Sequence, residues 1–125
     1  MSFDQILQTI VDDCGGGLGA ALMGLDGIAI TQVRGEGARA DDPLGGDVTT
    51  AGVEFGRVLA DVAKASDVLG TGAMREAVIS LDRVVLVFHG VDDDLFLVLA
   101  LAPDGNLGKA RYLIRRNLLD LRAEL

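Results

Sequence analysis

The dipeptide Asp26-Gly27 lies between two apolar runs and constrains the fold more than any other feature of the chain. In a two-residue type I′ turn both central residues have positive φ, a conformation that Asp-Gly adopts readily. Residues 18–25 and 28–33 are therefore predicted to form a hairpin with this turn at its tip. The expected register pairs Leu25 with Ile28, Met23 with Ile30 and Leu22 with Thr31.

Periodicity and turn signals predict the remaining elements. A first helix begins with capping-box spacing at Ser2 and Gln5 and ends at the glycines of 15–17. Connections between the strands are short, so the sheet should be antiparallel. The last two strands are apolar on both faces, which requires helices on both sides of the sheet. The other predicted segments are a mobile polar loop at 34–47, a second helix at 48–68, strands at 73–81, 84–88 and 95–102, and a last helix at 107–124.

Length, charge and cysteine content narrow the class of protein. The 125 residues suit a single α+β domain over 1–125, and 19 acidic against 11 basic side chains give a net charge of −8. This balance, with few aromatic residues, argues against nucleic-acid binding. A lone cysteine, Cys14, indicates a reducing compartment. No signal peptide opens the chain, and the apolar run at 95–102 is too short to span a bilayer, so we expect a cytoplasmic protein without membrane insertion.

The second predicted helix has more apolar surface than one sheet face needs. Its apolar arc covers roughly 200°, against about 100° for an ordinary surface helix. In one interpretation the sheet absorbs the large residues and a loop covers the small ones. In the other, the small residues pack against another chain, beside the strand at 73–81, which suits a sheet edge. The large residues are Phe55, Val58, Leu59, Val62 and Leu69, the small ones Gly52, Gly56, Ala60 and Ala63, and a solvated charged face holds Glu54, Arg57, Asp61 and Lys64.

Candidate catalytic, cofactor and metal motifs are weak throughout. The glycines at 15–19 lack the Lys-Ser/Thr of a phosphate loop and run from helix to strand, the reverse of phosphate-binding loops. The run Asp92-Asp93-Asp94 lacks the spacing of a calcium loop and is expected to be a solvated turn. His89 is the only histidine, and nothing places it beside a nucleophile. We therefore expect no enzyme activity, no cofactor and no metal site.

Two surfaces have the composition of protein-binding sites. Leu25, Asp26 and Ile28 form the hairpin tip, where the apolar pair either caps the core or docks a partner. On the last helix, Tyr112 and Leu119 are expected on the exposed face beside Arg115, either as a binding surface or as a solvated flank. From residue 107 onward five basic and two acidic residues give +3, while the first 106 hold six basic and 17 acidic, giving −11. The basic last helix could therefore be steered toward an acidic protein.

Three stretches make the chain resemble the roadblock/dynein light chain family. They are GAALMGLDGIAI at 19–30, VLG at 68–70 and NLGKAR at 106–111, and their order and spacing extend over nearly the whole chain. The resemblance implies a roadblock, profilin-like fold of order α-β-β-α-β-β-β-α, with a five-stranded antiparallel sheet between the second helix and the two terminal ones. It also implies a homodimer through the second helix and third strand, which would use Gly52, Phe55, Gly56, Leu59, Ala60, Ala63, Val78 and Ser80.

Within the family the chain looks like the bacterial polarity regulators of the MglB and MglC type. The implied partners are other roadblock or polarity proteins and a Ras-like small GTPase, with recruitment to the cell poles. MglB-type activators tend to carry a further C-terminal segment that contacts the GTPase, whereas this sequence stops at Leu125. We therefore expect an MglC-type adaptor of a motility switch, with a GTPase-activating protein as the alternative.

Overall fold

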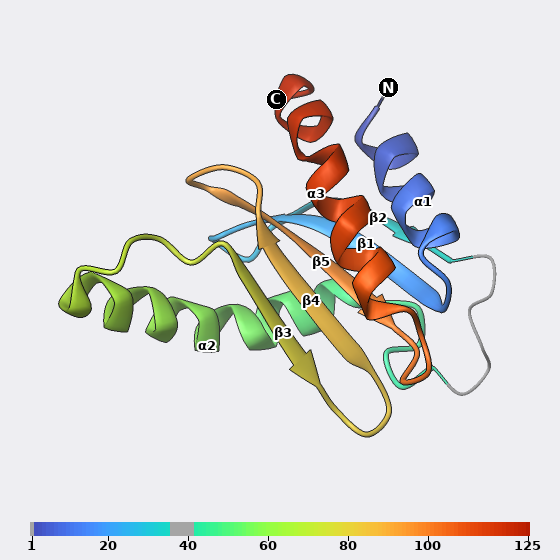
Figure 1. Ribbon diagram of the computed structural model, residues 1–125, viewed down its shortest axis with the longest axis horizontal. Helices are drawn as coiled ribbons and strands as arrows, with labels where there is room; N and C mark the ends of the chain where they lie inside the picture. The colour runs from blue at the N-terminus through green and yellow to red at the C-terminus, as the bar shows by residue number, and fades with distance from the viewer. Residues whose placement is uncertain (1, 36–41) are drawn as a thin grey trace.

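A computed structural model describes residues 2–35 and 42–125 and shows the predicted α+β architecture (Figure 1). One five-stranded sheet has the order β2-β1-β5-β4-β3, and each neighbouring pair is antiparallel. Part of the predicted loop at 34–47, residues 36–41, lies outside the described residues. The elements are α1 (Phe3–Asp13), β1 (Gly17–Gly24), β2 (Ala29–Arg34), α2 (Val48–Leu69), β3 (Glu76–Ser80), β4 (Val85–Gly90), β5 (Leu95–Leu101) and α3 (Leu107–Ala123).

Helices cover both faces of the sheet, as the apolar inner strands require. α1 and α3 lie together on one face, where Ile10 and Ile114 are fully buried against Leu99 of β5. On the other face, Phe88 and Val98 form a second core under the first turns of α2. Strand β5 is therefore buried on both faces, with α1 and α3 on one face of the sheet and α2 on the other.

Local signals in the sequence set the helix ends. The Ser2 hydroxyl accepts a hydrogen bond from the Gln5 N–H while the Gln5 side chain accepts one from the Ser2 N–H, which completes the capping box. Asn106 caps α3 through the Lys109 N–H. Gly70 ends α2 in the left-handed conformation, with φ of 66°.

The hairpin tip differs from the predicted type I′ turn. Asp26 has no positive φ, and the loop is Leu25-Asp26-Gly27, closed by the Gly27 N–H on the Gly24 carbonyl with Gly27 at φ 85°. Leu22 pairs with Thr31 as predicted, but Met23 pairs with Ala29 and leaves Ile30 as a bulge. The Met23–Ile30 and Leu25–Ile28 pairings were wrong because a three-residue loop with a bulge shifts the register by one residue.

Candidate protein-interaction surfaces

The second half of α2 projects past the sheet and exposes its apolar residues (Figure 1). Phe55 and Leu59 pack partly against the core, but Val58 is 51% and Leu69 73% exposed, and Val62 is exposed as well. The interpretation in which the sheet absorbs the whole large-residue arc is therefore wrong. The sheet ends before the helix does, so the apolar side chains in the second half of α2 are not covered by it.

The four small residues of α2 divide into two groups. Gly52 is buried, and a Cβ there would lie 2.1 Å from Met23 Sδ, so this glycine is needed for packing within the protomer. A Cβ on Gly56 would meet no atom within 4 Å, and Ala60 and Ala63 are exposed. The open part of the small-residue arc therefore begins at Gly56.

Strand β3 lies at the edge of the sheet beside this helix. Its inner side pairs with β4, and its outer side has no strand partner in the described chain. Val78 and Ser80 are exposed, while Ala77 and Ile79 pack toward the α2 core. We call the exposed residues Val58, Ala60, Val62 and Ala63, the half-buried Gly56 and the open edge of β3 the α2–β3 surface. The side chains of Val78 and Ser80 point to the opposite face of the sheet, because Val78 pairs with Val87 of the α1–α3 core.

The hairpin tip carries a second exposed apolar group. Leu25 is 69% and Ile28 65% exposed, so the tip does not cap the core. The Leu25 N–H donates to the Asp94 carbonyl at 3.0 Å, which joins the tip to the acidic β4–β5 turn. A shallow hollow of about 410 Å³ lies here, and we call its exposed lining residues Leu25, Asp26, Ile28, Ile30 and Asp94 the hairpin-tip surface.

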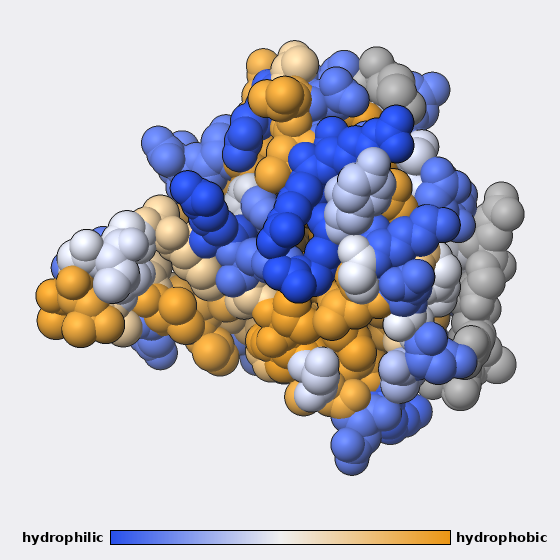
Figure 2. Space-filling view, in the orientation of Figure 1, coloured by the Kyte–Doolittle hydropathy of each residue, from blue (hydrophilic) through white to orange (hydrophobic). Residues whose placement is uncertain are grey.

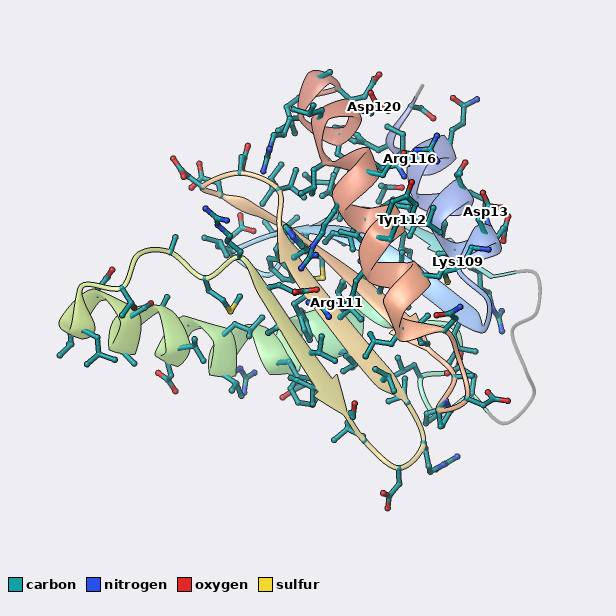
Figure 3. All side chains as sticks on the ribbon, viewed as in Figure 1. Asp13, Lys109, Arg111, Tyr112, Arg116 and Asp120 are labelled. Atoms are coloured by element: carbon teal, nitrogen blue, oxygen red, sulfur yellow. The ribbon has the colours of Figure 1, made fainter. Side chains whose placement is uncertain are left out.

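The outward side of α3 combines two apolar residues with cations. Tyr112 is 58% and Leu119 75% exposed, and Arg115 and Arg116 are exposed between them. Figure 3 shows Lys109, Tyr112 and Arg116 following one another along this helix. In Figure 2 hydrophilic residues cover α3, whereas apolar residues gather over β3 and along the projecting end of α2. We call Lys109, Tyr112, Arg115, Arg116 and Leu119 the α3 outer face.

Glu76 fastens β3 to α3. Arg111 donates to its two carboxylate oxygens at 2.7 and 2.9 Å, and Arg115 adds a longer contact at 3.3 Å. The hydrogen bonds from Arg111 lower the pKa of the Glu76 carboxyl. This clasp links the edge strand of the α2–β3 surface to the helix of the α3 outer face. This clasp was not predicted from the sequence, because its partners lie 35 positions apart.

His89, Arg122 and Cys14 each form a hydrogen bond to a backbone carbonyl. A hollow of about 590 Å³ includes Glu76, His89 and Arg122. His89 Nδ1 lies 2.8 Å from the Gly90 carbonyl, and Arg122 Nε donates to the Val91 carbonyl at 2.5 Å. Burial raises the pKa of the Cys14 thiol, which makes it a poorer nucleophile. Among residues 2–35 and 42–125, no group of three His, Cys, Asp or Glu side chains could hold a metal ion.

The glycines that follow α1 pack against residues 102–106 of the same chain. The Gly15 and Gly16 carbonyls accept hydrogen bonds from the Asn106 and Ala102 N–H groups. A Cβ on Gly16 would lie 2.6 Å from the Gly105 Cα. These glycines therefore permit close packing of the backbone against residues 102–106. Within the described part of the chain, no helix is long and apolar enough to cross a membrane.

Comparison with known proteins identifies relatives among solved structures. No family model and no curated protein matches the chain. The chain is similar to MglC from Myxococcus xanthus, at 35% identity over 100% of both chains with a TM-score of 0.70. The gliding protein MglB from Thermus thermophilus is 20% identical over 96% of this chain and 85% of its own, with a TM-score of 0.80. A Roadblock/LC7 domain from Streptomyces avermitilis is 15% identical over 98% and 97%, also with a TM-score of 0.80. The last two similarities concern the fold alone.

Proposed function

The chain belongs to the roadblock/LC7 family and is MglB/MglC-like, and on that premise we propose that it is a non-catalytic, homodimeric adaptor of a bacterial Ras-like GTPase switch. The switch would control cell polarity and motility, with the adaptor in the cytoplasm and recruited to the cell poles. The observation that carries the proposal is the unpartnered apolar half of α2 beside an open sheet edge. A surface of this kind needs a protein partner to cover it.

A second copy of the chain is the proposed cover for the α2–β3 surface. Val58 and Val62 would each contribute about 1 kcal/mol when covered, since they are about half exposed in the protomer. Pairing of two β3 edges would satisfy backbone groups that have no strand partner. Phe55 and Leu59 would contribute their remaining exposed surface, whereas Gly52 is already buried under Met23.

Light scattering after size exclusion tests the dimer. We expect a dimer at micromolar concentration, a monomer for Val62→Asp, and an unchanged dimer for Glu54→Lys, which alters the charged face of the same helix. Circular dichroism confirms that both variants are folded. A monomeric wild-type protein would contradict the proposal.

The hairpin-tip surface and the α3 outer face are the proposed sites for other roadblock or polarity proteins. Leu25 and Ile28 expose large side chains where neither core cluster needs them, which favours the tip as the main site. A pull-down from native lysate compares wild type with Leu25→Ala/Ile28→Ala and with Tyr112→Ala/Leu119→Ala. We expect a specific partner to be lost with the tip variant, and binding unaffected by both variants would exclude both surfaces.

An MglB-type activator that acts directly on the GTPase is the alternative function, favoured by the fold similarity to MglB. Phosphate release by the cognate GTPase, measured with and without saturating protein, separates the two. An adaptor leaves the hydrolysis rate unchanged, whereas an activator raises it.

A further inference from the structure

The hairpin-tip surface is acidic as well as apolar. Asp26 and Asp94 border the hollow, whereas Asp93 is exposed next to Asp94 in the chain and lines the separate hollow that holds Arg75, Arg115 and Arg122. Residues 24–30 and 91–95 contain no basic side chain, and the basic neighbour Arg57 lines a separate hollow on the α2 side of Leu25 and Asp26. The Asp92 carboxylate is occupied by the N–H groups of Asp94 and Leu95, whereas Asp93 and Asp94 make no side-chain hydrogen bond within the described chain. The Asp94 carboxylate therefore remains available to a partner next to Leu25 and Ile28, with Asp93 one residue away on the neighbouring side of the turn.

The α3 outer face has three cations, with Asp120 exposed one turn beyond Arg116, and the same apolar character. Tyr112 and Leu119 lie two turns apart, about 10 Å along the helix. Lys109 and Arg116 have no ion-pair partner among the described residues, and Arg115 makes only the 3.3 Å contact with Glu76. Aromatic and arginine side chains together are the composition of interface centres.

We propose that the hairpin-tip surface of one molecule docks on the α3 outer face of a second copy, so that the homodimers of the proposed function associate further. The tip hollow would receive Tyr112 or Leu119, and Asp93 and Asp94 would face Lys109 and Arg116. Two copies at a net charge of −8 repel each other at long range, so their association requires such locally opposed patches.

A second copy is the occupant because each chain carries both halves of the contact. The contact joins two different surfaces, and contacts of this type extend or close into larger assemblies when each unit is already a dimer. It would also cover Leu25 and Ile28, so self-association and partner binding at the tip would compete. This inference takes only the homodimer from the proposed function.

Charge exchange tests whether the two surfaces meet. Variant one is Lys109→Glu/Arg116→Glu and variant two is Asp93→Arg/Asp94→Arg, which leaves Asp92 in place to hold its turn. Sedimentation velocity at low salt should show wild type above the dimer mass, with each variant about tenfold or more weaker in association. An equimolar mixture should regain the larger species, because each variant then finds an oppositely charged surface.

The control is a charge reversal outside both surfaces. Asp82→Arg, in the β3–β4 turn, should leave assembly unchanged, and added salt should weaken wild-type assembly. A wild type that stays at dimer mass, variants that still assemble, or a mixture that does not recover would each overturn the inference. The same charge-exchange variants are also made with Val62→Asp, which removes the homodimer of the proposed function. If the mixture still associates, the contact between the hairpin tip and α3 exists independently of that homodimer.

Discussion

Alanine at two glycines of α2 separates packing inside the protomer from packing between protomers. Gly52 and Gly56 lie one helical turn apart, so each alanine brings the same gain in helix propensity, about 1 kcal/mol. Their surroundings differ completely. A Cβ at Gly52 would lie 2.1 Å from Met23 Sδ and 3.6 Å from Val98 Cγ1, whereas a Cβ at Gly56 would meet nothing within 4 Å.

The expected magnitudes follow from these distances. Met23 is fully buried, so forcing it aside costs about 1–3 kcal/mol, and Gly52→Ala should lose up to about 2 kcal/mol of unfolding free energy overall. Gly56→Ala should gain up to about 1 kcal/mol in the isolated protomer. If a second copy packs closely at Gly56, the same methyl group should weaken dimerisation by about 1–3 kcal/mol, or roughly 5- to 150-fold in Kd.

Two measurements read the two effects separately. Chemical denaturation at several protein concentrations, fitted globally, gives the unfolding free energy of the protomer, and sedimentation equilibrium gives the dimer Kd. Equal stabilities for Gly52→Ala and Gly56→Ala would refute the packing argument at Met23. An unchanged dimer Kd for Gly56→Ala would show that the small residues of α2 do not form the close contact between protomers.

Three further outcomes are expected. The lowered pKa of Glu76 means that its contribution to stability is present above its unfolded pKa, near 4.5, and is lost as pH falls through the folded value. The unfolding free energy of wild type should therefore exceed that of Glu76→Gln at pH 7, and the difference should shrink at pH 3. A difference that is the same at both pH values would contradict the role of Arg111. Burial and a raised pKa should leave Cys14 unreactive to a disulfide reagent until the protein unfolds, and rapid labelling of the native state would disprove this. Gly27→Ala should cost about 1–2 kcal/mol of unfolding free energy, since φ is 85°, and a neutral result would exclude backbone strain.

Element type and order were predictable because the short-range signals are strong and mutually consistent. The Ser2–Gln5 capping box set the start of α1, and apolar runs with short turns predicted all five strands. The predicted strand at 73–81 is shorter in the structure, Glu76–Ser80, although the Gly90 N–H still donates to the Arg75 carbonyl. Such ends depend on how far a neighbouring strand reaches, which local sequence does not record.

The distribution of exposed apolar residues could be predicted only in part. Periodicity shows which side of α2 is apolar, but the length of the sheet beneath it decides where burial stops. Gly52 and Gly56 have the same spacing signal, yet only Gly52 has Met23 against it. The bulge at Ile30 likewise follows from closure of the hairpin loop, because an Asp-Gly pair suits both two-residue and three-residue loops.

The effect of the net charge on association depends on how the fold distributes the charged residues over the surface. A net charge of −8 suggests general repulsion between copies, yet residues 107–125 carry +3 while the first 106 carry −11. Asp94 lines the hollow at the apolar tip, and Lys109 and Arg116 lie on either side of Tyr112 along α3. Since exposed charges are screened within about 10 Å at 0.1 M salt, these local patches govern contact while the net charge governs approach. The same molecule can therefore stay dispersed at long range and still bind through surfaces that combine one sign of charge with exposed apolar groups.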